Sequence, residues 1–174
     1  MLTYADLAAM PDDGTRHELL DGELIVSPSA NTRHQRLSVR LAFAFHLHIR
    51  SRGGGEMFEA LDVVFADMTV VQPDVLFIAD DQQGILTDAN VQGVPALVIE
   101  IVSDSRYDRV RKRDIYARFG VPEYWIVDPD ADRIEVYRLQ GNAYVRPQVY
   151  EVGDSLAFGG LPGMTLDLNE LFAR

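Results

Sequence analysis

The sequence predicts a mixed α/β fold, in which a central sheet is flanked by helices and carries an added C-terminal hairpin. Residues 96–102 (ALVIEIV) and 123–128 (EYWIVD) are nearly continuous apolar runs, as in strands that are buried on both faces. Residues 107–119 predict a helix, so the three segments form a parallel strand–helix–strand crossover. Residues 133–150 predict an antiparallel hairpin with a glycine-asparagine turn, which makes the sheet mixed.

The segment before this unit predicts a strand pair and a long helix. Residues 17–29 (HELLDGELIVSPS) are typical of two strands joined by an Asp-Gly turn. In residues 31–55, apolar side chains recur at helical spacing until three consecutive glycines end the pattern, which predicts a long amphipathic helix. The remaining predicted elements are a helix at residues 3–10 capped by Thr3, strands at 57–66 and 74–79, a polar loop at 80–95, a strand near 155–158 and a helix near 167–172.

Length, composition and charge restrict the class of protein. The chain has 174 residues, which suits one domain over residues 1–174, and it has no cysteine, which excludes disulfides and thiolate metal sites. No apolar stretch approaches the roughly 20 residues that span a membrane. The N-terminus lacks the basic region of a signal peptide, so we expect a cytoplasmic protein.

The net charge of −11 argues against a general nucleic-acid coat protein, because phosphate binding relies on lysine and arginine. The basic residues are nevertheless unevenly spread, so an acidic chain can still present a local basic surface. The alternative is that they are solvated helix faces. The two basic segments contain Arg33, Arg36, Arg40, Arg50 and Arg52, and Arg106, Arg109, Arg111, Lys112, Arg113 and Arg118.

Glu100 interrupts the apolar run of residues 96–102 and therefore needs a partner, because a buried carboxylate is costly unless it is paired, hydrogen-bonded or bound to metal. The preceding strand offers Asp74, also among apolar residues. Two neighbouring carboxylates repel unless a cation lies between them, and oxygen ligands suit Mg²⁺ or Mn²⁺. The alternative is that Glu100 pairs with an arginine or lies at a strand end.

Lys112 is the only lysine beside 15 arginines, and helical spacing places it on one stripe with Ile115 and Tyr116. We therefore expect it to point inward, toward the sheet that carries Glu100. A lysine amine is compact and its pKa can be shifted, whereas a guanidinium stays protonated. The alternative is that Lys112 is retained by chance and has no chemical role, or that it extends from the edge of the stripe to solvent.

Asp74, Glu100 and an inward Lys112 together form the set that metal-dependent phosphodiester hydrolysis needs. The acids would hold the metal ion, which polarises the phosphoryl oxygen and lowers the pKa of an attacking water. The lysine would orient that water or stabilise developing negative charge. The sequence therefore predicts a hydrolytic site between two strands and the helix of residues 107–119.

Four segments resemble a known family: "HELLDGEL…SPS…H", "QPDVLFI", "LVIEIVSDS" and "YDRVRKRDIYARFGVPEYWIVDP". They are similar to the Uma-type putative endonuclease family, a bacterial branch of the PD-(D/E)XK nuclease superfamily. The general superfamily motif places the lysine two residues after the acid, where this chain has Val102. In the Uma-type branch the lysine lies on the following helix in a D-x₃-K-x₃-Y pattern, which Asp108, Lys112 and Tyr116 match.

The resemblance implies a restriction-endonuclease-like core and a homodimer that cleaves DNA, with RNA as an alternative substrate. It implies Asp74 and Glu100 as ligands of Mg²⁺ or Mn²⁺ and Lys112 as the catalytic lysine. It also implies supporting roles for Glu18, His34 and Tyr116. A second function from another class stays open, namely a nuclease-fold binding or assembly module with weak or no catalysis, which the acidic net charge favours.

Several of these residues also have ordinary structural interpretations. Glu18 is nearly as well explained as a surface acid beside a turn, and His34 is better explained as a surface histidine at a helix start. His46 and His48 diverge on a helix and form no metal pair. Asp62 alternates within its strand and is a further candidate for an inward acid. Aromatic core positions are expected at Tyr124 and Trp125.

Overall fold

The main sheet is mixed, as predicted. The computed structural model describes residues 1–27, 29–102 and 106–174, without the side chains of residues 106–108. Its seven-stranded sheet has the order β10-β9-β8-β7-β6-β3, with β11 also paired to β9. Strands β7 and β8 are parallel, and the other pairs are antiparallel. The strands are β3 (Gly55–Glu59), β6 (Val75–Ala79), β7 (Leu97–Ile101), β8 (Glu123–Asp128), β9 (Arg133–Gln140), β10 (Ala143–Tyr144) and β11 (Gln148–Glu151).

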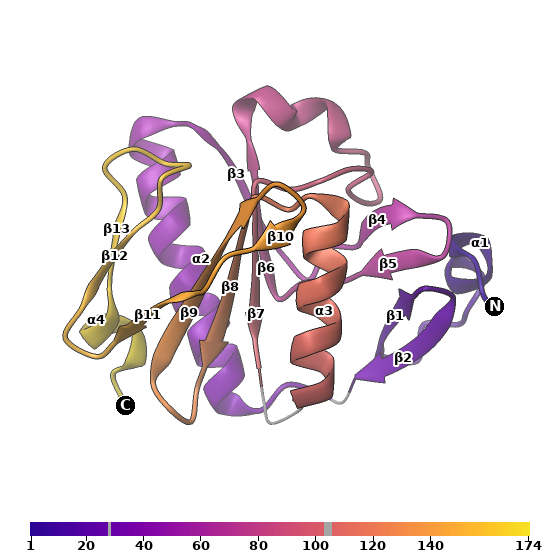
Figure 1. The fold of residues 1–174 in the computed structure, drawn as a ribbon, viewed down its shortest axis with the longest axis horizontal. Coiled ribbons are helices and arrows are strands. Elements are labelled where there is room, and N and C mark those ends of the chain that lie inside the picture. Colours follow the sequence, from indigo (N-terminus) through magenta and orange to yellow (C-terminus); the bar gives the residue numbers. More distant parts are fainter. Residues whose placement is uncertain (28, 103–105) are drawn as a thin grey trace.

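Two helices cover opposite faces of this sheet, α2 (Thr32–Arg52) behind it and α3 (Arg106–Phe119) in front of it (Figure 1). Because side chains alternate along β7, Ile99 packs with Phe45 of α2, whereas Val98 packs with Tyr116 of α3. Glu100 follows this alternation onto the face that α3 covers. None of the described helices is long and apolar enough to cross a membrane.

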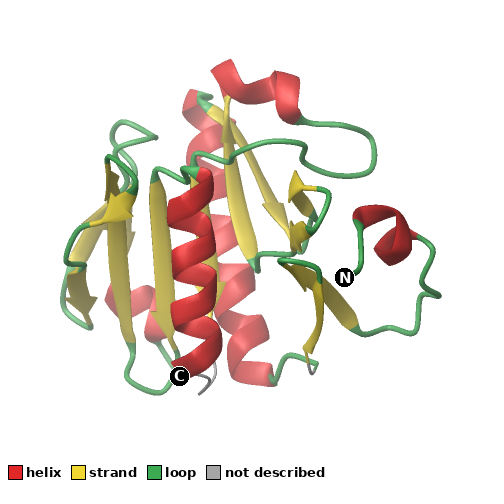
Figure 2. Cartoon of the chain, turned by 45° about the vertical axis from the view of Figure 1, so that its right-hand side comes forward, coloured by secondary structure: helices red, strands yellow, loops and turns green. Residues whose placement is uncertain are grey.

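A smaller antiparallel sheet lies beside the main sheet, at the end nearest the N-terminus (Figures 1 and 2). The predicted strand pair forms one half of it, and its Asp-Gly turn has positive φ at both residues, 55° at Asp21 and 79° at Gly22. The order is β2-β1-β5-β4, with β1 (Arg16–Leu20), β2 (Glu23–Ser27), β4 (Val63–Ala66) and β5 (Thr69–Val71), and α1 (Tyr4–Ala8) packs on β1.

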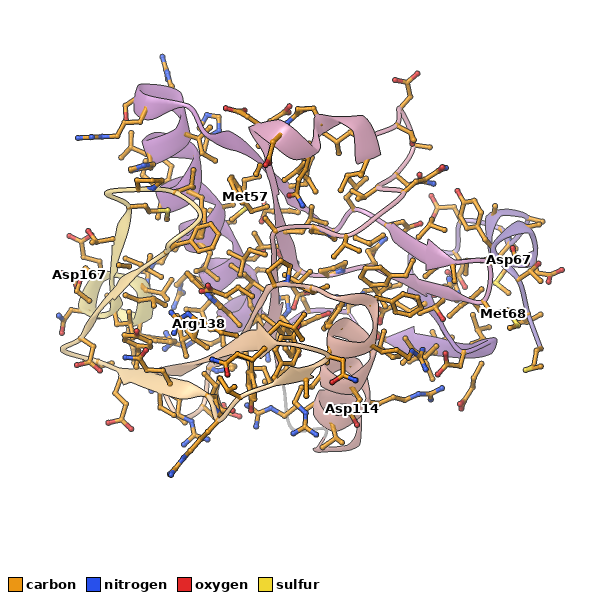
Figure 3. The ribbon with its side chains drawn as sticks, turned by 45° about the horizontal axis from the view of Figure 1, so that its top comes forward. Met57, Asp67, Met68, Asp114, Arg138 and Asp167 are labelled. Carbon is orange, nitrogen blue, oxygen red and sulfur yellow. The ribbon has the colours of Figure 1, made fainter. Side chains whose placement is uncertain are left out.

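The prediction of one strand over residues 57–66 is wrong. Ala60 adopts a positive φ of 50°, which ends β3 and starts a separate strand, β4. After β4, Asp67 and Met68 form a turn that leads into β5, a strand that the sequence did not reveal (Figure 3). The polar loop of residues 80–95 contains the short 3₁₀ helix η1 (Asp80–Ile85).

The C-terminal segment adds a short strand pair and a helix on the α2 side of the sheet. The strand predicted near residues 155–158 is β12 (Ser155–Ala157), and it pairs with β13 (Thr165–Asp167), which the sequence did not reveal. The predicted last helix is α4 (Leu168–Phe172). Its buried side chains join the same apolar cluster as α2.

Gly55, at the start of the edge strand β3, has no room for a side chain. A Cβ atom there would lie 2.3 Å from the carbonyl oxygen of Ile78 and 2.6 Å from the ring of Phe77. Gly55→Ala should therefore lower the free energy of unfolding by roughly 1–3 kcal/mol, measured by urea denaturation. The control Gly84→Ala meets no atom within 4 Å, so its effect should stay below about 1 kcal/mol. Equal effects at the two positions would contradict this packing.

Candidate functional site

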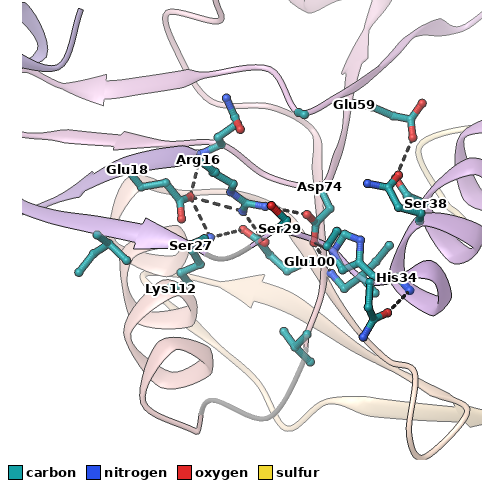
Figure 4. A pocket seen from close by; sticks show the side chains of 18 of the residues that line it. Arg16, Glu18, Ser27, Ser29, His34, Ser38, Glu59, Asp74, Glu100 and Lys112 are labelled. Carbon is teal, nitrogen blue, oxygen red and sulfur yellow. Dashed lines mark hydrogen bonds and ion pairs between the residues drawn. The ribbon is translucent and has the colours of Figure 1, made fainter. Parts of the chain in front are cut away.

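Three carboxylates meet where the smaller sheet abuts the main sheet (Figure 4). Glu18 comes from β1, Asp74 directly precedes β6, and Glu100 lies in β7; their relative exposures are 0%, 7% and 4%. The antiparallel register pairs Val75 with Ile99, which brings Asp74 next to Glu100 at the end of the ladder. The interpretation of Glu18 as a surface acid is therefore wrong.

Lys112 points into this acid cluster, as its helical stripe predicts. Its Nζ lies 2.8 Å from Glu18 Oε1 and 3.0 Å from Glu100 Oε1, and the residue is 8% exposed. One turn later on α3, the hydroxyl of the fully buried Tyr116 donates a 2.6 Å hydrogen bond to Glu100 Oε1. The side chain of Asp108, the first residue of the D-x₃-K-x₃-Y pattern, is outside the described part of the chain.

Arg16 is the member of the site that sequence reasoning missed. Its guanidinium donates to Asp74 Oδ1 at 2.7 Å and to Glu100 Oε2 at 3.3 Å, and it lies 3.6 Å from Glu18 Oε1. The alternative in which Glu100 pairs with an arginine is therefore realised, together with the lysine contact. The available signal was strand alternation, because Arg16 and Glu18 are two residues apart on β1 and so share a face.

Asp74 is held on its other side by backbone and by α2. The N–H of Ile101 donates a 2.7 Å hydrogen bond to Asp74 Oδ2, and His34 Nε2 lies 3.1 Å from the same oxygen. Asn31 caps α2 and accepts the backbone N–H of His34 at 2.9 Å, which fixes the first turn beside the cluster. With a side-chain exposure of 18%, His34 is not the surface histidine that was expected.

The hydrogen-bond donors around the acids stabilise their ionised forms, but not equally. Burial raises the pKa of Glu18 and of Asp74, yet Lys112 and Arg16 together outweigh it at Glu18, and His34 and Arg16 together outweigh it at Asp74, so both pKa values lie below the ordinary range. Burial, with repulsion from the other two acids, holds the pKa of Glu100 above its ordinary value in spite of Lys112 and Arg16.

Burial would lower the pKa of Lys112, but the charges of Glu100 and Glu18 outweigh it and raise that pKa above its ordinary value. The sequence suggested that a lysine was retained because its pKa can shift, and the shift is upward. Lys112 therefore stays protonated at neutral pH, and its ammonium group acts as a charged hydrogen-bond donor.

A cavity of about 660 Å³ opens onto the cluster, which is within the size range of small-ligand sites. Arg16, Glu18, Asp74, Glu100 and Lys112 all contribute to its wall. Across the cavity, α2 and β3 meet through a 2.7 Å hydrogen bond from Ser38 to Glu59 (Figure 4). A small ligand in this cavity would therefore contact the charged groups of the cluster directly.

The remaining candidates lie outside the cluster. Asp62 accepts a 3.0 Å hydrogen bond from the side chain of Gln72, whose backbone N–H donates to Glu18, so Asp62 is a neighbour of the cluster rather than a member. Tyr124 and Trp125 are fully buried in the core, as predicted. Among the described residues, neither His46, which is exposed, nor His48 belongs to a group of three or more histidine and acid side chains arranged to hold a metal. The acid cluster, in which Arg16 lies between Asp74 and Glu100, does not form such a group either.

Five arginines of the two basic segments bind acids of the same chain, one in the first segment and four in the second, which reduces the local basic surface of the second segment. Such pairs keep these side chains folded against the protein. The ion pairs are Arg33–Asp132, Arg109–Asp128, Arg111–Glu23, Arg113–Asp114 and Arg118–Asp21.

The donor chemistry at the cluster fits a hard divalent cation. Asp74 Oδ1 and Glu100 Oε2 both contact one cationic group, the guanidinium of Arg16, so the two acids already converge on a positive charge. Carboxylate oxygens are the ligands that Mg²⁺ and Mn²⁺ prefer. Glu18 Oε2 is buried and has no hydrogen-bond partner within the described residues, which leaves one further acceptor beside the pair.

Comparison with known proteins finds a family model, a relative and a solved structure that resemble this chain. The family model Uma2, described as "Putative restriction endonuclease", matches residues 4–169. An uncharacterized protein from Synechocystis sp. is 27% identical over 149 residues, which cover 82% of this chain and 83% of that protein. The crystal structure of a "putative nuclease" from Anabaena variabilis has a TM-score of 0.84 at 18% identity, over 99% of this chain and 98% of that chain. The structural likeness confirms the predicted fold class.

The charge pairing of Glu18 can be tested through stability. Glu18→Gln keeps the shape but takes from Lys112 one of its two buried carboxylate partners, and the lowered pKa of Glu18 shows that the fold stabilises this charge, so the free energy of unfolding in EDTA should fall by about 3 kcal/mol. The control Asp114→Asn removes the exposed carboxylate that pairs with Arg113 on the outer side of α3 (Figure 3). Its effect should be below about 1 kcal/mol.

Chemical denaturation of both variants in EDTA at pH 7 makes this comparison. A Glu18→Gln variant as stable as wild type would contradict the pairing, because it would mean that burying the Glu18 carboxylate costs as much as its contacts with Lys112 and Arg16 contribute.

Proposed function

The chain belongs to the Uma2 family, described as "Putative restriction endonuclease", and on this premise we propose that it hydrolyses phosphodiester bonds in DNA with a divalent metal ion. The observation that carries the proposal is the convergence of Asp74 and Glu100 on one cationic group beside the buried ammonium of Lys112. RNA is the alternative substrate of the same chemistry.

In this proposal, Asp74 and Glu100 hold Mg²⁺ or Mn²⁺. When bound, such an ion polarises a phosphoryl oxygen and lowers the pKa of a nearby water. Each acid has one oxygen fixed by the protein: Asp74 Oδ2 by the Ile101 N–H, and Glu100 Oε1 by Tyr116. The fixed oxygens orient the carboxylates, so that the opposite oxygens, Asp74 Oδ1 and Glu100 Oε2, both face the guanidinium of Arg16.

Lys112 supplies positive charge in the same proposal. Its raised pKa keeps Nζ protonated, so it donates hydrogen bonds to an oxygen that gains negative charge instead of removing a proton. Glu18 Oε1 holds the ammonium at 2.8 Å and is itself held by the N–H of Gln72. Glu18, Tyr116 and His34 are thus proposed as positioning residues rather than catalytic ones.

Three further expectations from the sequence stay predictions. The homodimer is supported by an exposed apolar stripe on α2, formed by Val39, Phe43 and Leu47 with exposures of 58%, 66% and 58%. The single domain over residues 1–174 is supported by a family match that covers most of that range. The cytoplasmic location has no support beyond the sequence features that suggested it.

A nuclease-fold binding or assembly module with weak or no catalysis is the second candidate. It is favoured by the net charge of −11 and by the arginines that bind acids of the same chain. Such a protein would keep the buried cluster for stability alone. It would bind nucleic acid weakly, because few cations remain to neutralise phosphates.

Cleavage of supercoiled plasmid in Mg²⁺, Mn²⁺ or EDTA tests the proposal. Wild type should nick or cut the plasmid only with metal, and Asp74→Asn, Glu100→Gln and Lys112→Met should each lower the rate roughly a hundredfold or more. Lys112→Arg should not restore it, because the larger guanidinium does not fit the buried space that the compact ammonium occupies. The control Arg118→Gln, on the exposed side of α3, should cleave like wild type.

Circular dichroism of each variant separates loss of chemistry from loss of fold. Folded wild type that leaves DNA and RNA intact in both metals would favour the assembly module. Full activity in a folded Lys112→Met variant would remove the lysine from the proposed mechanism.

A further inference from the structure

Each of the paired acids has one oxygen that only Arg16 contacts among the described residues. Glu100 Oε1 is bound by Lys112 and Tyr116, but Oε2 accepts from Arg16 alone. Asp74 Oδ2 is bound by Ile101 and His34, but Oδ1 accepts from Arg16 alone. Removing this one guanidinium would therefore leave two carboxylate oxygens, Oδ1 and Oε2, that converge on the space it had filled.

The charges of the cluster favour one cation in that space at a time. With His34 counted as neutral, the three carboxylates carry three negative charges and Arg16 with Lys112 carries two positive ones, so the buried group has one excess negative charge. A divalent ion that replaced Arg16 would make the group neutral. A divalent ion added beside Arg16 would make it positive and would press two cations together in a poorly solvated place.

Arg16 is also the least buried member of the cluster. Its side chain is 21% exposed, against 10% for Lys112 and 0%, 6% and 5% for Glu18, Asp74 and Glu100. It lies on the cavity wall at the start of β1, and its Nε has no partner within the described residues. The guanidinium can therefore leave toward the cavity without breaking the contacts that fix the acids from behind.

We propose that Arg16 is an internal counter-cation, which neutralises Asp74 and Glu100 in the metal-free protein and leaves them when a divalent ion binds. This inference rests on the proposed metal-dependent function. After the exchange, the guanidinium lies in the cavity, where a phosphate group of the substrate would replace the two acids as its partner. Metal binding would thus create a phosphate contact in the same step.

If Arg16 had another role, its removal would change the metal affinity in a different direction. A fixed arginine that only orients the acids would support the ligands, so its removal would weaken metal binding. A counter-cation competes with the metal, so its removal strengthens metal binding. The gain in affinity equals the factor by which Arg16 weakens metal binding in wild type. The sign of the change in Mn²⁺ affinity therefore distinguishes the two roles without any measurement of cleavage.

Isothermal calorimetry with Mn²⁺ on the full chain gives that sign. Arg16→Gln should bind Mn²⁺ about tenfold more tightly than wild type. The matched control Arg118→Gln removes the same charge from an exposed pair with Asp21 and should bind like wild type. Arg16→Lys keeps a cation near the acids, so its affinity should lie between those of wild type and Arg16→Gln.

Thermal unfolding supplies the second measurement. In EDTA, Arg16→Gln should melt below wild type because the acids lose a counter-charge, and Mn²⁺ should raise its melting temperature more than that of wild type. If Arg16→Gln does not fold, Arg16→Lys decides, and binding no tighter than that of wild type would overturn the proposal. Equal or weaker Mn²⁺ binding by a folded Arg16→Gln variant would also overturn it and leave the proposed function standing.

Absence of Mn²⁺ binding in wild type and in both Arg16 variants would overturn the metal-dependent function and the exchange together. That outcome differs from equal binding by wild type and Arg16→Gln, which would overturn the exchange alone.

Discussion

The structure of this protein depends on the neutralisation of three buried carboxylates. Glu18, Asp74 and Glu100 have almost no access to solvent, and a buried carboxylate without a partner is costly. Arg16 and Lys112 reach them from different elements, β1 and α3. Removing one partner of such a group leaves a charge buried and unpaired. The stability lost in this way is larger than the net stability that the whole group contributes.

The same contacts hold the separate parts of the fold together around the cavity. Arg16 joins the smaller sheet to β6 and β7, Lys112 joins α3 to both sheets, and His34 joins α2 to the acid that precedes β6. A site built in this way is rigid on the side of the acids and open on the side of the cavity. Catalysis by preorganised charge requires that combination, because the groups must be in place before charge develops.

Much of the fold and part of the site could be predicted from local patterns. Glu100 could be located because it interrupts an apolar strand, and Lys112 because helical spacing groups it with Tyr116. Arg16 could not, because its acceptors are 58 and 84 residues away and their meeting depends on how the two sheets dock. His34 was assigned to the surface for the same reason. The strand β5 was missed because three residues give too short a pattern for alternation to be recognised.

A crystal structure of the protein soaked in Mn²⁺ tests the central claim that the acids form a cation site which Arg16 fills when no metal is bound. An anomalous difference map collected for manganese locates the ion directly. The account predicts a peak between Asp74 and Glu100, with the guanidinium of Arg16 moved into the cavity and Lys112 still bound to Glu100. The account would be contradicted if, at a Mn²⁺ concentration that saturates binding in solution, the map showed no peak between Asp74 and Glu100 and Arg16 still bound both acids.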